Sequence, residues 1–387
     1  MQHEQLVAKL NDKRLRVRLK SLKTLSLNTE KEGGYDGADK NINYVFRTVY
    51  SCFDRTPSRA VYYTNKFNVP LTAIVDYASL SAADELIKAE KITGGIYYCG
   101  AEVAVKDDSG KRIILSAVGV PHKNVKAFND DLSSYRSKRL SYINSLREKL
   151  NARFKKYSIS LPYAFWSLFG PIKTTSVEDL FYNLASKIVE KFQTAEAVKN
   201  FLTNELGIEL LEEESKKLDD LSSKLYVVDL AYALKNKLKI KHPVEEMNKA
   251  DHFLALCSKY GAISSATYKD GDLDAFLEEV KSLGINSATM EFSADNQALM
   301  QEFYDKCMAL EILPIVRTLV THPRRKLDYT FEDETLAQKY RENTLCLVGH
   351  EISASTVVED GMFSPSTVER FPSLQERIKL FSRVGLK

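Results

Sequence analysis

Two blocks of alternating strand and helix patterns, separated by a long stretch of helix patterns alone, constrain the fold of this chain most strongly. In the first block, strand patterns at 71–77 and 95–105 flank an amphipathic helix pattern at 80–92. In the second block, strand patterns at 261–268 and 287–293 flank another helix pattern. This alternation is typical of sheets or barrels whose strands run parallel. The sequence therefore predicts an α/β fold.

The middle of the chain differs from both blocks. It is rich in Lys, Glu and Leu, repeats apolar residues at three- and four-residue spacing, and has almost no strand pattern. We interpret it as a helical insertion into the α/β body. The predicted organisation is an N-terminal helix at 1–30, a first part of the body at 40–124, the insertion at 125–250 and a second part of the body at 251–387.

The N-terminal helix places leucines from Leu6 to Leu25 roughly on one face, with Lys and Arg between them. This pattern favours a helix packed on the body over a basic helix that binds an anionic partner. The formal net charge of the chain is only +3, which does not argue for nucleic acid by itself. We therefore expect no nucleic-acid partner, and the oligomeric state stays open.

Composition also bears on where the protein works. No stretch approaches the roughly 18 apolar residues of a membrane span, and the first residues lack the apolar block of a signal peptide. The five cysteines are odd in number and form no C-x-x-C pair, which is typical of reduced, buried thiols. We expect a cytoplasmic protein with no membrane association.

The six histidines are too few and too scattered for most metal sites. No two of them lie within five residues of each other, so H-x-H and H-E-x-x-H pairs are absent. A cluster of several histidines would have to recruit nearly all of them. Histidine-rich metallohydrolase chemistry is therefore disfavoured.

Three segments in the first block resemble the opening motifs of the PHP (polymerase and histidinol phosphatase) superfamily. Residues 43–51, NYVFRTVYS, followed by Thr56-Pro57, are similar to (D/N)-x-H-x-H-T-x-Y-S with its following T-P. Residues 73–80 resemble A-I-x-D-H-x-x-L, and residues 100–102 resemble G-x-E, in the order and spacing of the family. Further matches point to one branch with a helical insertion, and they include GVPH at 119–122, PRR at 323–325 and LVGHE at 347–351.

The resemblance implies a distorted (β/α)7 barrel with its ligand site at the carboxyl ends of the strands. Active members of the family hold two or three metal ions there and hydrolyse phosphoesters. In this chain Val45 and Arg47 stand at the two histidine positions of the first motif, and Tyr77 stands at that of the second. Val118 and Thr267 stand at two further ligand positions. Most of the metal ligands are therefore replaced.

Only Asp76 and Glu102 keep a ligand type at the matched positions. Valine has no lone pair to offer, and the positive charge of Arg47 repels a cation. Two buried carboxylates would have raised pKa values without a cation between them, and a guanidinium restores the charge balance. We hypothesise that Arg47 replaces the metal and bridges Asp76 and Glu102. We expect no cofactor, and the alternative is one divalent ion (Mg, Mn or Zn) on the two carboxylates.

Other polar residues are candidates for catalysis. His122 follows a strand end, where it can line a pocket mouth or make a structural hydrogen bond. His350 and Glu351 follow the apolar run 345–348 and can form an acid–base pair, or they can end a C-terminal strand. The segment Lys269–Asp272 lacks the remaining oxygens of a calcium loop, so we interpret it as a turn and helix start.

The basic residues Arg317 and Arg324, with Arg47, can line one anion-binding mouth at the barrel top, and Tyr77 and His322 are further candidates there. The alternative is a solvated basic loop. The main hypothesis is a pseudoenzyme that binds an anionic or phosphorylated small molecule, or a protein partner. The alternative is an active metal-dependent phosphoesterase that uses Asp76 and Glu102 with a histidine brought near by folding.

Overall fold

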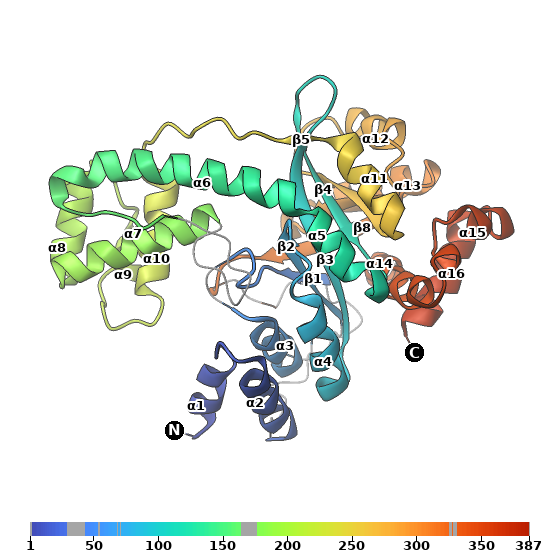
Figure 1. Cartoon of the computed structure of the whole chain (residues 1–387), viewed down its shortest axis with the longest axis horizontal. Helices are drawn as coiled ribbons and strands as arrows, with labels where there is room; N and C mark the ends of the chain where they lie inside the picture. The colour runs from blue at the N-terminus through green and yellow to red at the C-terminus, as the bar shows by residue number, and fades with distance from the viewer. Residues whose placement is uncertain are drawn as a thin grey trace. The chain divides into compact units, whose positions relative to one another are not determined.

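The computed structural model describes residues 2–28, 43–52, 55–67, 69, 71–163, 176–324, 327 and 331–386. The chain divides into two compact units, drawn in Figure 1. The larger, which we call the barrel unit, comprises Met1–Tyr50, Arg55–Tyr135 and Met247–Lys387. The smaller, the helical unit, comprises Ser51–Asp54 and Arg136–Glu246.

A closed barrel of seven strands forms the centre of the barrel unit. The strands follow the order β2-β1-β8-β7-β6-β4-β3, and β3 pairs with β2 to close the ring. Neighbouring strands are parallel, except that β4 runs antiparallel to both β3 and β6. The α/β barrel predicted from the sequence is confirmed. The strands are β1 (Asn43–Phe46), β2 (Leu71–Tyr77), β3 (Ile96–Lys106), β4 (Arg112–Val118), β6 (Ile263–Tyr268), β7 (Ser287–Glu291) and β8 (Leu313–Val320), and a short β5 (Asn248–Lys249) pairs with the end of β3.

Helices follow most of the strands and bury their apolar faces against the barrel. Local signals fix several of their ends: the Thr56 hydroxyl caps α3 with Pro57 at its first position, and Asp272 caps α12. The segment Lys269–Asp272 is thus a turn and helix start, as predicted. The helices are α1 (Gln2–Lys9), α2 (Leu15–Asn28), α3 (Pro57–Lys66), α4 (Ala83–Thr93), α5 (Val125–Asp131), α11 (Ala250–Tyr260), α12 (Leu273–Ser282), α13 (Gln297–Ala309), α14 (Glu334–Thr356), α15 (Pro365–Arg370) and α16 (Leu374–Gly385).

The N-terminal segment forms two helices where the leucine pattern predicts one. The Asp12 carboxylate accepts from the Arg14 backbone N–H at 2.8 Å, and the Arg18 guanidinium donates to the Asp12 carbonyl oxygen, also at 2.8 Å. These bonds turn the chain between α1 and α2. Leu22 and Leu25 are buried in the core of the barrel unit, so the predicted packing against the body is confirmed.

The apolar run 345–348 is helical, which corrects the strand interpretation. It lies within α14, whose residues Leu345, Cys346 and Leu347 are all buried because the helix packs on the barrel and on α16. A helix covered on both sides is apolar all round and loses its 3.6-residue pattern. The five cysteines of the chain are free and buried, as expected.

The helical unit has a hydrophobic core of its own. Leu146, Leu184, Leu202 and Leu230 are fully buried there. Ser176 and Asp179 form a capping box at the start of the helix Val177–Phe192. Its helices are α6 (Ser133–Phe154), which begins in the barrel unit, α7 (Val177–Phe192), α8 (Ala195–Asn200), α9 (Glu212–Lys217) and α10 (Tyr226–Lys237). None of the helices in the described parts of the chain is long and apolar enough to cross a bilayer.

Candidate functional site

Four charged side chains gather where the parallel strands end, which we call the upper end of the barrel. Arg47 directly follows β1, Glu102 lies in β3, Glu291 is the last residue of β7, and Arg317 lies in β8. The β7–β8 register places Glu291 directly beside Arg317. We call these four residues the charge network.

Ion pairs join the charge network into one chain. The guanidinium of Arg47 donates to Oε1 of Glu102, and Nη2 of Arg317 donates to Oε2 of Glu102 at 2.9 Å. Nε of Arg317 also donates to Oε1 of Glu291 at 2.9 Å. Both oxygens of Glu102 are therefore occupied by guanidinium groups.

The electrostatics of Glu102 follow from these contacts. Burial alone would raise its pKa, but the positive charges of Arg47 and Arg317 outweigh burial and lower the pKa to about 2. Burial also opposes the charged form of Arg317, whereas Glu102 and Glu291 raise its pKa above the ordinary value. Both partners stay ionised over the physiological pH range.

One guanidinium nitrogen of Arg47 takes no part in the charge network. This nitrogen, Nη1, is buried and makes no hydrogen bond in the described parts of the chain. The Arg47 side chain is only 12% exposed. A buried N–H donor without an acceptor loses its hydration at a cost of roughly 1–3 kcal/mol, so this nitrogen is a candidate contact for a ligand.

Asp76 does not share a face of the sheet with Glu102. The β2–β3 register pairs Tyr77 with Glu102 and Asp76 with Ala101, and paired residues face the same side while consecutive residues alternate. Asp76 instead accepts from the backbone N–H of Thr48 at 2.7 Å and from the Thr48 hydroxyl at 2.5 Å. The expectation that Arg47 bridges both carboxylates is right for Glu102 and wrong for Asp76.

The side chains present do not fit a metal ion at this position. Asp76 and Glu102 face opposite sides of the sheet, and guanidinium groups occupy both oxygens of Glu102. Across the described residues, no group of three or more His, Cys, Asp or Glu side chains could hold an ion. Tyr77 is the residue beside Glu102 on the same face, and a phenol is a poor substitute for the imidazole of the motif.

The three candidate catalytic residues lie at the other end of the barrel. Because β4 is antiparallel, its last residue Val118 pairs with Ile263, the first residue of β6. His122 follows β4 and therefore lies at this lower end, away from Glu102. There Nε2 of His122 contacts Oε1 of Glu351 in α14 at 2.6 Å. The sequence alone could not predict this contact, because the two residues are 229 positions apart.

The pKa values of this pair shift for different reasons. The hydrogen bond that His122 donates to Glu351 raises the pKa of His122, although burial opposes that shift. Burial raises the pKa of Glu351, and His122 only partly offsets it. Glu90 in α4 adds a second nearby carboxyl, whose pKa is also raised by burial and by Glu351. The pair can share a proton, and its catalytic role stays a prediction.

His350 does not pair with Glu351, so that part of the prediction is wrong. Its Nδ1 accepts from the Met362 backbone N–H at 2.9 Å, and its Nε2 lies 2.8 Å from the Gly261 carbonyl oxygen. The ring must therefore carry its proton on Nε2. Burial lowers its pKa to about 4, so His350 is a neutral side chain that links α14 to two loops.

The loop after β8 returns to the upper end. Nδ1 of His322 accepts from the Arg324 backbone N–H at 2.9 Å, which turns the loop, and the Arg324 side chain is exposed. The ligand-binding roles of His322, Arg324, Arg317 and Tyr77 stay predictions.

Glu291 belongs to the charge network, although the sequence pattern did not identify it as a site residue. The one indication in the sequence is an acidic residue near the end of the strand pattern at 287–293.

Comparison with known proteins finds similarity in solved structures alone. No protein-family model matches the sequence, and no curated protein matches it. A candidate metal-dependent phosphoesterase from Bifidobacterium adolescentis superposes with a TM-score of 0.46 at 14% identity, covering 78% of this chain and 96% of its own. An amidohydrolase from Chromobacterium violaceum, with bound sulfate and no metal, superposes with a TM-score of 0.48 at 14% identity, covering 76% of this chain and 91% of its own.

Proposed function

We propose that this chain is a PHP-like barrel that has lost metal-dependent phosphoester hydrolysis and binds a small anionic ligand at its upper end. The observation that supports this proposal is the pairing of Glu102 with two guanidinium groups. A guanidinium supplies the positive charge that an ion would otherwise bring, in a fixed geometry. It cannot generate a hydroxide nucleophile as a metal does.

The chemistry of the ligand follows from the donors that the protein leaves unpaired. Arg47 Nη1 is buried without an acceptor in the described residues, and so is the hydroxyl of Ser116. Ser116 lies directly opposite Glu102 in the β3–β4 ladder, on the same face of the sheet. A guanidinium N–H and a hydroxyl on one face suit the oxygens of a phosphate or a carboxylate.

Binding of inorganic phosphate tests the proposed ligand class. We expect phosphate to raise the melting temperature of the wild-type protein and to bind in calorimetry, because binding to the native state stabilises it. Arg47→Met should abolish both effects while Arg317 still pairs with Glu102. Arg16→Met, which removes an exposed arginine of α2, is the matched control and should bind as wild type does. Equal binding by Arg47→Met would refute the proposal.

Metal content and turnover test the lost hydrolysis. We expect the purified protein to carry substoichiometric divalent metal by elemental analysis and to leave bis(p-nitrophenyl) phosphate intact with added Mn²⁺. The competing function is an active metal-dependent phosphoesterase. Turnover that depends on Mn²⁺ and disappears in Glu102→Gln would establish that function and overturn ours.

A further inference from the structure

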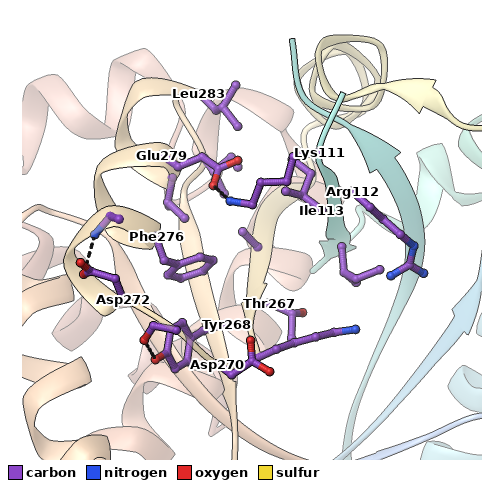
Figure 2. Close-up of a pocket in the computed structure, with 17 residues that line it drawn as sticks. Lys111, Arg112, Ile113, Thr267, Tyr268, Asp270, Asp272, Phe276, Glu279 and Leu283 are labelled. Carbon is purple, nitrogen blue, oxygen red and sulfur yellow. Dashed lines mark hydrogen bonds and ion pairs between the residues drawn. The ribbon is translucent and has the colours of Figure 1, made fainter. Parts of the chain in front are cut away.

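A separate pocket of about 430 Å³ lies in the wall of the barrel unit. Figure 2 shows it between the start of β4, the end of β6 and the helix α12. No member of the charge network lines it. A volume of this size is in the range of pockets that hold small organic ligands, roughly 300–1,000 Å³.

The pocket exists because two neighbouring strands separate. The β4–β6 ladder ends at the pair Leu115–Ala266, although β4 starts three residues earlier, at Arg112, and β6 continues to Tyr268. Apolar side chains line the gap from the side of α12, and they include Phe276, Val280, Leu283 and Ile285. The pocket therefore offers an apolar floor to a ligand.

Two buried polar atoms in the pocket have no hydrogen-bond partner among the described residues. Lys111 donates to Oε2 of Glu279 at 2.7 Å, as the dashed line in Figure 2 shows. The other oxygen of Glu279, Oε1, is buried and has no hydrogen-bond donor among the described residues. The hydroxyl of Thr267 is buried without a partner in the same way. A buried carboxylate oxygen in this state favours a ligand that brings an N–H donor.

Cationic side chains at the rim complement this acceptor. The exposed side chains of Arg112 and Lys269 line the pocket, and within the described parts of the chain neither makes an ion pair. Asp272 is committed to capping α12, where it accepts from the N–H groups of Asp274 and Ala275. The pocket thus offers a carboxylate acceptor, unpaired cations and an apolar surface together.

We propose that this pocket binds a zwitterionic amino acid with an apolar side chain. Its ammonium group donates to Oε1 of Glu279, its carboxylate meets Arg112 or Lys269, and its side chain lies on Phe276 and Leu283. Six charged residues line the pocket. The positive charges of Lys111, Arg112 and Lys269 are equal in number to the negative charges of Asp270, Asp272 and Glu279. A zwitterion keeps this balance, whereas a ligand of one charge would upset it.

Ligand analogues test each contact by calorimetry. We expect L-leucine and L-phenylalanine to bind, and N-acetyl-leucine, which lacks the ammonium group, to bind at least about tenfold more weakly, since a hydrogen bond to a charged group contributes about 1.5–3 kcal/mol. Leucinamide, which lacks the carboxylate, should also bind more weakly than leucine. Absence of leucine and phenylalanine binding, or equal binding of N-acetyl-leucine and leucine, would overturn the proposal.

Variants assign the site. Glu279→Gln should weaken leucine binding about tenfold, whereas Glu278→Gln, an exposed neighbour on the same helix, should bind as wild type does. Leu283→Trp should fill the pocket and abolish binding, with circular dichroism confirming that the variant is folded. Arg47→Met should bind leucine normally, which separates this site from the proposed anion site. Unchanged binding by both Glu279→Gln and Leu283→Trp would refute the assignment.

Discussion

At the scale of single residues, Glu102 is the side chain on which the upper end of the barrel depends. Its side chain is only 10% exposed and joins two arginines, one directly after β1 and one in β8. Removing one partner of a buried ion pair leaves an uncompensated charge, which costs about 3–5 kcal/mol. We expect Glu102→Gln to lower the free energy of unfolding by about 3 kcal/mol in urea titrations at neutral pH.

The pH dependence of that loss follows from the lowered pKa of Glu102. A carboxyl group whose pKa falls from 4.5 to about 2 on folding contributes stability that is complete above pH 4.5 and is lost as the pH falls toward 2. The difference in unfolding free energy between wild type and Glu102→Gln should therefore shrink through this window. A difference that stays constant from neutral pH to pH 3 would contradict the assigned ion pairs.

The His122–Glu351 pair makes a second residue-scale prediction. The hydrogen bond that His122 donates to Glu351 raises the pKa of His122, so Glu351→Gln should lower that pKa. Titration of the His122 ring protons by NMR measures it directly. Glu359→Gln, an exposed position after the same helix, is the control, and an unchanged pKa of His122 in Glu351→Gln would rule out the pair.

Residue identities alone predicted part of this site. Arg47 opposite Glu102 followed from charge balance, because a buried carboxylate requires a cation. The face on which Asp76 lies required the strand register, which a motif does not state. The His122–Glu351 contact required knowing that β4 is antiparallel and that α14 is a helix, since both facts place the two residues at the lower end.

At the scale of elements, close contact between α14 and α16 fixes one side of the barrel unit. Gly349 and Gly385 lie where the two helices meet, and a Cβ on Gly349 would overlap the carbonyl oxygen of Phe381. Gly349→Ala must push the helices apart, and overpacking of this kind costs about 1–3 kcal/mol or more. We expect a lower melting temperature, whereas Gln375→Ala on the exposed face of α16 should change little. Wild-type stability in Gly349→Ala would refute this packing.

Gly349 also explains why the sequence pattern suggested a strand here. The apolar run 345–348 precedes Gly349, and a short apolar run next to glycine is typical of a buried strand. The run is helical because barrel and α16 cover it on two sides. Periodicity cannot separate a buried strand from a helix buried all round, so this ambiguity was inherent in the pattern.

At the scale of the whole molecule, the hydrophobic core of the helical unit is separate from the core clusters of the barrel unit in the described parts of the chain. Leu184 is fully buried in the core of the helical unit, and Leu313 is fully buried within the barrel unit. The composition of the middle segment predicted the helices but not the separate core, since a helical insertion can equally pack all its apolar faces on the body. Domains with their own cores generally fold as units.

We therefore expect two calorimetric unfolding transitions, one for each unit. Leu184→Ala should lower the temperature of one transition and Leu313→Ala that of the other, because truncating a buried leucine costs about 2–5 kcal/mol in the unit that contains it. Leu211→Ala, at a position 66% exposed in the helical unit, should shift neither. A single transition that both core variants lower equally would show that the two cores unfold as one cooperative structure.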